Sequence, residues 1–288
     1  MLGPLDIFRS ECRLENTKVH HHDATVFCRS QWQRNTESDG KFSWGARAYL
    51  VYRWLVFLFL LFGGLVYDFT VTLGEKKCTT SELHCKLIWP VFLTNWNTFF
   101  TFLQMGLSAF LVTKHQLFPS KSGAEMQLVH KVYWVVNNIC NGLAPIVAFM
   151  YWFAVHNPEV HVIDYMNIRE HAVFSLLVLI DVLLVAHPTR LLHVYHPVLL
   201  GLSYVTFSFL YHALGGISRL GQPYLYSILD WTYPGRALTV GLACLMSDCV
   251  VFFIMWTIHL ARRSVASSCT QKKIAPANEN CAKEFANA

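Results

Sequence analysis

Apolar and polar positions in this chain are arranged in long blocks. The clearest apolar block, residues 50–73, reads LVYRWLVFLFLLFGGLVYDFTVTL. Comparable blocks follow at residues 87–112, 129–155, 165–186, 194–215 and 237–260. A helix needs about 20 residues, each rising about 1.5 Å, to cross the hydrocarbon core of a bilayer, and its backbone must bond to itself there. The pattern therefore predicts an all-α fold, a polytopic membrane helical bundle with six transmembrane helices.

The overall composition argues against a soluble helical domain. Hydrophobic residues make up 54% of the chain and charged residues only 14%, and the mean hydropathy is +0.35. Six apolar blocks joined by short loops leave no large charged surface that could face water.

Lys and Arg residues are divided unequally between the two sides of the predicted bundle. With six spans both termini lie on one side, and that side carries sixteen Lys and Arg residues against six on the other. The positive-inside rule places the richer side, with both termini, in the cytoplasm. The net charge of +5 is concentrated in the tails, where anionic lipids attract it. The expected partner is thus the lipid bilayer, and the scattered basic residues argue against nucleic acid.

Two cytoplasmic tails are predicted to flank a transmembrane domain of residues 50–260. Residues 1–49 lack the apolar core of a cleavable signal peptide, so the first span would act as the insertion signal. Trp32 and Trp44 are unusual in a solvated tail and favour a surface helix or folding against the cytoplasmic face. Residues 261–288 contain few large apolar side chains and are expected to be disordered.

Nine cysteines occur in the chain, and Cys78 and Cys85 are the two that fall in a predicted outer loop, GEKKCTTSELHCK. A pair in a short loop that faces an oxidising compartment is expected to form a disulfide. Two free thiols are the alternative.

Polar residues within the predicted spans are costly in a membrane and are candidates for a function. Asp181 lies in the fourth span, at a depth similar to that of Asn137, Asn138 and Asn141 in the third. A contact between Asn and Asp on neighbouring helices would satisfy both side chains. Asp248, near the middle of the sixth span, has no evident partner in the sequence.

Thr94 and His171 are the residues from which chemistry is expected. Each lies about six residues inside a span entered from the outer side, which places both roughly 10 Å below the boundary. A hydroxyl group needs a base within hydrogen-bonding reach to become a nucleophile, and His is the commonest base. In the alternative, structural interpretation, Thr94 bonds to its own helix and His171 caps an interface.

Other histidines do not predict a metal site. His20, His21, His22 and Asp23 are contiguous, and neighbouring residues rarely converge on one metal ion without a structured loop. Three further histidines surround Arg190 in a predicted cytoplasmic loop, where they are expected to meet lipid headgroups or helix ends: His187, His193 and His196. No metal or cofactor is predicted.

Two stretches of sequence are more specific than transmembrane composition. They read HHD…FCRSQWQ in the N-terminal tail and YHPVLLGLSYVTFSFLYHALGG, followed by YLYSILDWTYPGRAL, later in the chain. Through them, residues 20–260 resemble the rolling stone family of animal multi-pass membrane proteins. The founding member is associated with myoblast fusion, so the resemblance implies a role in cell–cell fusion during muscle development. It also implies the plasma membrane as the location, with the endoplasmic reticulum membrane as the alternative.

The rolling stone family is itself distantly similar to androgen-induced membrane hydrolases, which cleave fatty acid esters of hydroxy fatty acids. That resemblance assigns the Thr of those enzymes to Thr94 in LTNWN and their His to His171 in REHAVF. It implies an alternative function, in which His171 deprotonates Thr94 for attack on a lipid ester.

The sequence departs from the hydrolase pattern on both sides of this pair. Arg169 and Glu170 precede the His, and Asn95-Trp96-Asn97 follows the Thr. Asn95 or Asn97 would be available to stabilise the oxyanion. A transporter is a third alternative, supported only by Pro145 and Asp181.

Overall fold

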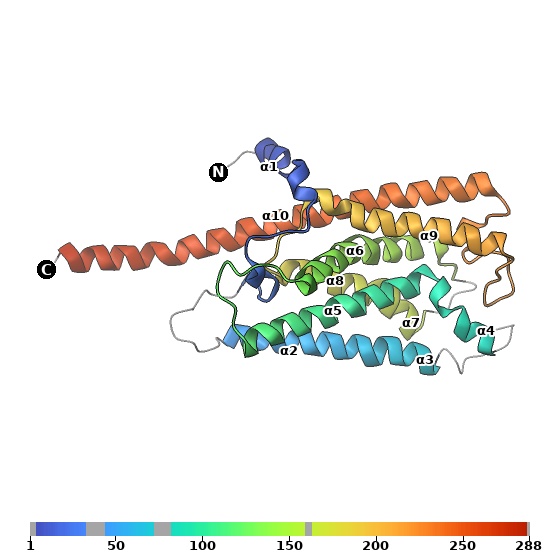
Figure 1. Cartoon of the computed structure of the whole chain (residues 1–288), viewed down its shortest axis with the longest axis horizontal. Coiled ribbons are helices and arrows are strands. Elements are labelled where there is room, and N and C mark those ends of the chain that lie inside the picture. The colour runs from blue at the N-terminus through green and yellow to red at the C-terminus, as the bar shows by residue number, and fades with distance from the viewer. Residues whose placement is uncertain (1–3, 33–43, 72–81, 159–162, 287–288) are drawn as a thin grey trace.

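The computed structural model describes residues 4–32, 44–71, 82–158 and 163–286, and within these ranges the chain is helical (Figure 1). Six helical rods form the bundle: α2 (Trp44–Phe59) with η3 (Leu60–Val66) and α3 (Tyr67–Val71); α5 (Leu93–Leu117); α6 (Leu128–Met150) with η5 (Tyr151–Val155); α7 (Tyr165–Ile168) with η6 (Arg169–Val173) and α8 (Phe174–Leu184); α9 (Tyr195–Ala213); and α10 (Pro234–Ala286). Shorter helices lie outside the rods: α1 (Pro4–Glu11), η1 (Leu14–Thr17), η2 (Ala24–Phe27), α4 (Glu82–Leu87), η4 (Trp89–Val91), η7 (Leu191–Val194) and η8 (Ser227–Leu229). The predicted all-α class is confirmed.

Four of the helices in the described residues are long and apolar enough to cross a membrane. They are Gly45–Thr70, Leu128–Val155, Leu191–Ala213 and Pro234–Ser268. The other two rods are more polar. Helix α5 buries Asn97, Thr101 and Gln104, and the rod from α7 to α8 buries Arg169, Glu170 and Asp181. That six helices cross the membrane therefore stays a prediction. The described residues establish an all-helical fold with four candidate spans.

Helix α6 lies at the centre of the bundle and packs against α5, α8, α9 and α10 (Figure 1). In its most apolar part 56% of the residues are buried, compared with 22–28% in the other three candidate spans. Those three helices direct many large apolar side chains outward, for example Phe62, Leu199 and Met246. Such a continuous apolar exterior suits contact with lipid tails and would be unfavourable in water.

A buried ion pair joins two rods in the core of the bundle. Arg53 on α2 pairs with Asp181 on α8, and both side chains are fully buried. Gln104 donates to the second carboxylate oxygen of Asp181 at 2.8 Å, and Asn137 donates to the same oxygen at 3.4 Å. The predicted contact between Asn and Asp is thus confirmed, but the principal partner of Asp181 is Arg53, on the first rod.

The N-terminal segment folds against one end of the bundle. The amide of Gln31 donates to the carbonyl of Leu184 at 2.8 Å, and the Trp32 indole donates to that of Leu183 at 2.9 Å. The ring of Phe27 stacks on His187 with centroids 5.0 Å apart. Folding of this segment against the bundle, predicted from its aromatic residues, is confirmed; that this face is cytoplasmic stays a prediction.

His187 and His193, in the loop after α8, are buried, so of the two predicted placements, lipid headgroups or helix ends, the first does not hold for them. His187 Nε2 lies 3.2 Å from the Tyr133 hydroxyl, and His193 Nδ1 lies 2.9 Å from the Asn138 amide nitrogen. Burial, and then the positive charge of Arg262, lowers the pKa of His187 to about 3, so its ring is neutral. The N-terminal segment covers this loop, and the sequence of the loop alone gives no sign of that cover.

Helix α10 continues well beyond residue 260 and projects past the bundle (Figure 1). Its packed part includes Arg262, which donates to the carbonyls of Val182 and His187, and Ala266, which is buried. Over residues 261–286 the chain is helical, where the sequence predicts a disordered tail. That expectation rested on the scarcity of large apolar residues, whereas Ala, Lys, Gln and Glu, which recur there, favour helix. The boundaries of the three predicted regions stay predictions.

Candidate functional site

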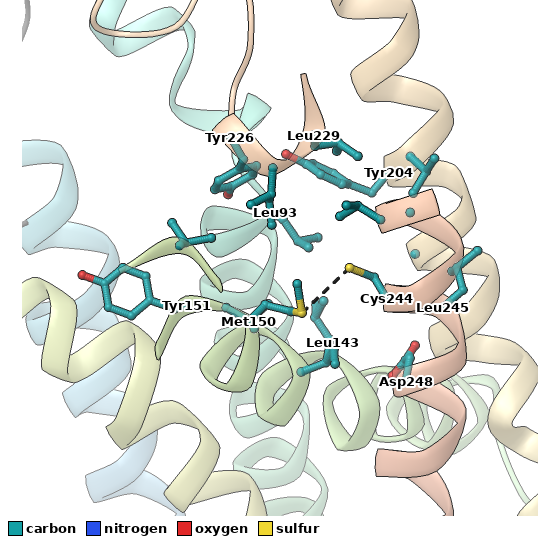
Figure 2. A pocket seen from close by; sticks show the side chains of 18 of the residues that line it. Leu93, Leu143, Met150, Tyr151, Tyr204, Tyr226, Leu229, Cys244, Leu245 and Asp248 are labelled. Atoms are coloured by element: carbon teal, nitrogen blue, oxygen red, sulfur yellow. Dashed lines mark hydrogen bonds between the residues drawn. The ribbon is translucent and has the colours of Figure 1, made fainter. Parts of the chain in front are cut away.

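A pocket of about 120 Å³ lies within the bundle and is lined mainly by aliphatic and aromatic side chains (Figure 2). Its wall is formed by the start of α5, the second half of α6 with η5, by η6, α9, the segment around η8, and α10. Thr94 and His171 both line it. The structure thus brings the two residues singled out from the sequence to one cavity, although they come from separate rods.

Thr94 is the second residue of α5 and is partly buried. No side chain caps this helix, which begins after the extended residue Phe92. The first amide groups of a helix have no carbonyl partner within it, and they give that end a partial positive charge. The carbonyl four residues before Thr94, that of Pro90, accepts a hydrogen bond from the Trp96 indole at 2.6 Å. The hydroxyl group of Thr94 is therefore placed at the positive end of a helix, on the wall of the pocket.

His171 is buried in η6, a π-helical turn, and π-helical turns frequently occur at functional sites. Its ring stacks on Tyr151, with centroids 3.6 Å apart and planes 3° from parallel. The Tyr151 hydroxyl donates to Asn167 Oδ1 at 2.7 Å, and the Trp152 indole donates to the carbonyl of His171 at 2.9 Å. These contacts hold both the backbone and the ring of His171, so the orientation of the imidazole at the pocket is fixed.

The charged residues before His171 form an ion cluster outside the pocket. Arg169 Nη2 lies 2.5 Å from Asp68 Oδ1 and from Glu170 Oε1. Arg169 Nη1 also donates to the carbonyl of Gly63, in the π-helical turn η3, at 2.7 Å. Neither Arg169 nor Glu170 lines the pocket. Arg169 and Glu170, at which the sequence departs from the hydrolase pattern, therefore connect η6 to the first rod. They do not interrupt the apolar wall of the cavity.

Asn95 and Asn97, the residues expected to be available for an oxyanion, do not line the pocket. Asn95 donates to the carbonyl of Trp89, and Asn97 is fully buried and accepts from Thr101 at 3.4 Å. Tyr226 lines the pocket instead. Its hydroxyl group is buried beside Thr94 and makes no hydrogen bond of standard geometry within the described part of the chain. Tyr226 belongs to the connection between α9 and α10, within the YLYSILDW block, and no pattern in the sequence shows that it approaches Thr94.

The opposite end of the pocket is bounded by Asp248 on α10 (Figure 2). A Cβ atom at Gly142 on α6 would lie 2.4 Å from Asp248 Oδ1 and 2.6 Å from Cβ of Pro197. The missing side chain of Gly142 therefore makes room for the carboxylate. Between the two ends, Cys244 Sγ and Met150 Sδ lie 3.9 Å apart across the pocket (Figure 2).

The other residues considered for chemistry have structural surroundings. Asp23 accepts a hydrogen bond from the amide of Thr25 at 2.9 Å and caps η2, while His21 Nδ1 lies 3.1 Å from the amide of Asp23. Within the described ranges, no three His, Cys, Asp or Glu side chains are grouped so that they could hold a metal ion. Cys78 lies outside the described residues and the side chain of Cys85 is not among those described, so their disulfide stays a prediction.

Comparison with known proteins gives a match that covers the bundle and the pocket. The family model described as Protein rolling stone matches residues 5–270. The chain is 27% identical over 267 residues to Protein rolling stone of Drosophila melanogaster, which covers 89% of this chain and 90% of that protein. No solved structure matches the chain. The resemblance suggested by the two sequence blocks is confirmed, and this chain belongs to the rolling stone family.

Proposed function

We propose that this protein is an intramembrane hydrolase of lipid (fatty acid) esters, with Thr94 as the nucleophile and His171 as the base. The observation that supports the proposal is that both residues line one apolar pocket inside the bundle. Enzyme sites that bind apolar ligands are typically such pockets, with a few polar groups that converge on the reacting atoms. Of the three functions that the sequence leaves open, namely cell–cell fusion, ester hydrolysis and transport, this geometry favours the hydrolase.

In the proposed reaction, Thr94 Oγ1 attacks the carbonyl carbon of the ester while the imidazole of His171 takes the hydroxyl proton. The tetrahedral oxyanion lies at the positive end of α5, where the Tyr226 hydroxyl is available to donate to it. The intermediate then expels the alcohol, which takes its proton from His171, and leaves an acyl ester on Thr94. Water, deprotonated by His171, attacks this acyl ester and releases the fatty acid and the free Thr94 hydroxyl.

Tyr151 acts in this scheme as a positioning residue. Its ring lies against the whole face of the imidazole, and its own hydroxyl is held by Asn167. A general base must keep its nitrogen directed at the hydroxyl group that it deprotonates. Contacts that hold the imidazole in one orientation meet this requirement.

The full chain, purified in detergent micelles, should react with a fluorophosphonate probe, which modifies activated hydroxyl groups. Mass spectrometry of the digest should place the modification on Thr94, and prior incubation with p-nitrophenyl decanoate should slow the labelling. The same sample should release p-nitrophenol from this ester. Labelling at a different residue, or the absence of both labelling and ester cleavage, would contradict the proposal.

A role in cell–cell fusion during muscle development is the second candidate, and membership of the rolling stone family favours it. Such a role places the protein in the plasma membrane, where surface biotinylation of intact cells would detect it; retention in the endoplasmic reticulum would prevent that labelling. Comparison of the fusion of myoblasts that express the wild type or Thr94→Ala would then show whether the two candidate functions depend on one another.

We also propose that all six rods cross the membrane and that both termini are cytoplasmic. The two ends of the chain lie at the same end of the bundle (Figure 1), and the Lys and Arg residues are concentrated on that side. Epitope tags at either terminus should be hidden from antibody in intact cells and become accessible when the plasma membrane is permeabilised. Staining of either tag on unpermeabilised cells would contradict the arrangement.

A further inference from the structure

The carboxylate of Asp248 is a polar group for which the described part of the fold provides no hydrogen-bond or ionic partner. The residue is 5% exposed, and its Oδ1 atom has no hydrogen-bond partner within the described part of the chain. The buried arginines of the described bundle are engaged elsewhere. Arg53 pairs with Asp181, and Arg169 pairs with Asp68 and Glu170. Arg262 donates to the carbonyls of Val182 and His187. Burial of a carboxylate without a partner destabilises the folded protein, so the presence of an Asp at this position requires an explanation.

Asp248 is poorly placed to hold neighbouring helices together. Across the interface its Oδ1 atom lies beside Gly142, and Pro197 lies beside the same glycine. Gly has no side-chain donor, and Pro has neither a side-chain donor nor a backbone N–H group. Polar residues that join membrane helices do so through hydrogen bonds between them, and none reaches Asp248 Oδ1 here.

The carboxylate instead lines the pocket, at the end opposite Tyr226. Figure 2 shows Tyr226 and Leu229 at one end of the cavity and Asp248 at the other. Along α10, Val240 and Asp248 both line the pocket, and eight residues of helix span about 12 Å. The α10 residues between them that face the cavity are Gly241, Cys244 and Leu245. A ligand that fills this cavity therefore meets a mostly apolar stretch about 12 Å long, followed by a carboxylate.

We propose that Asp248 makes the pocket selective for acyl chains that carry a hydroxyl group at the end remote from the ester, which rests on the proposed ester hydrolysis at Thr94. A hydroxyl group donates to an ionised carboxylate and accepts from a protonated one, so it pairs with Asp248 in either state. An ammonium group would have to bring a charge through an apolar cavity. The substrate class is therefore esters of ω-hydroxy fatty acids. Met150, whose side chain is flexible, lies across the path to Asp248 and can adapt its shape to the chain.

The first test compares kcat/KM of the full chain for the p-nitrophenyl esters of ω-hydroxydecanoic and decanoic acid. The wild type should prefer the hydroxy ester by about 10-fold, the effect of one hydrogen bond to a charged group. Asp248→Leu should reverse this preference, whereas Asp248→Asn, which can still donate and accept, should keep most of it. Cys244→Ala serves as a matched control, since it alters the same wall without a carboxylate and should leave the ratio unchanged.

A second test separates this inference from the hydrolase itself. Decanamide and ω-hydroxydecanamide contain no ester, and the shift in Tm that each causes reports binding alone. The hydroxy amide should raise Tm more than the plain amide in the wild type, and this difference should vanish in Asp248→Leu. If the difference appears while neither ester is cleaved, the hydrolase is wrong and the selectivity of Asp248 stands. Equal shifts in the wild type, or a preference that survives in Asp248→Leu, would overturn the inference.

Discussion

Replacement of Thr94 or His171 by Ala is expected to lower the rate of ester hydrolysis by at least about 10³-fold. Thr94→Ala removes the atom that attacks the ester, and His171→Ala removes the group that accepts its proton. Because the two act as a unit, the double variant should lose no more activity than the more damaged single variant. The measurement is kcat with p-nitrophenyl decanoate, supported by probe labelling of the same samples.

Matched controls are available elsewhere in the bundle. Thr206 on α9 is exposed and bonds to the carbonyl of Leu202 in its own helix, so Thr206→Ala should keep full activity. His212 lies near the end of the same helix, with Nδ1 2.8 Å from the carbonyl of Pro223, and His212→Ala should also be active. Activity of Thr94→Ala close to that of Thr206→Ala would show that the hydroxyl group is structural.

Loss of Arg53 is expected to destabilise the protein by about 3–5 kcal/mol, because it leaves the charge of Asp181 buried without its partner. Arg53→Met keeps most of the volume of the side chain and removes its charge. The double variant Arg53→Met/Asp181→Leu should regain part of the loss, since no unpaired charge then remains, although Gln104 and Asn137 lose their acceptor. Unfolding in one detergent, followed by circular dichroism, measures both effects.

Arg236 provides the comparison, because it is exposed at the start of α10 and its replacement by Ala should change the stability by less than about 0.5 kcal/mol. A single variant Arg53→Met as stable as Arg236→Ala would mean that the pair of Arg53 and Asp181 contributes nothing to the stability of the fold. A double variant less stable than the single one would show that the neighbouring amides, rather than Arg53, govern the energy of this site.

The positions of the rods were predictable because the surface that faces lipid must be apolar along its whole length. Each apolar block of the sequence corresponds to one rod, and in the two most apolar candidate spans, those of α2 and α10, only 28% and 22% of the residues are buried. Helix α5 and the rod from α7 to α8 are not among the four candidate spans, and both carry several polar or charged side chains. They keep residues such as Gln104 and Asp181 on buried faces. A hydropathy averaged over all residues of a helix does not distinguish its buried face from its exposed face.

The candidate site was predictable only in part. Equal depth and the family resemblance brought Thr94 and His171 together, and both line the pocket. The approach of Tyr226 to Thr94 depends on how a long connection folds back, and the free carboxylate of Asp248 depends on a glycine in another helix. Arg53 is separated from Asp181 by 128 residues, and no local pattern links them. Contacts that arise from the packing of distant segments leave no signal in the spacing of a single sequence.

The docking of the N-terminal segment has a consequence for the order in which the protein is made. Ser30 donates a hydrogen bond to the carbonyl of Leu184, which follows 154 residues later. At about 5–20 residues per second, the ribosome takes roughly 8–30 s to produce this partner after Ser30 has been synthesised. During that interval Phe27 lacks the His187 ring on which it later stacks. The N-terminal segment therefore reaches its final position only after α8 has been synthesised. A nascent chain that stops before α8 lacks the groups to which this segment binds.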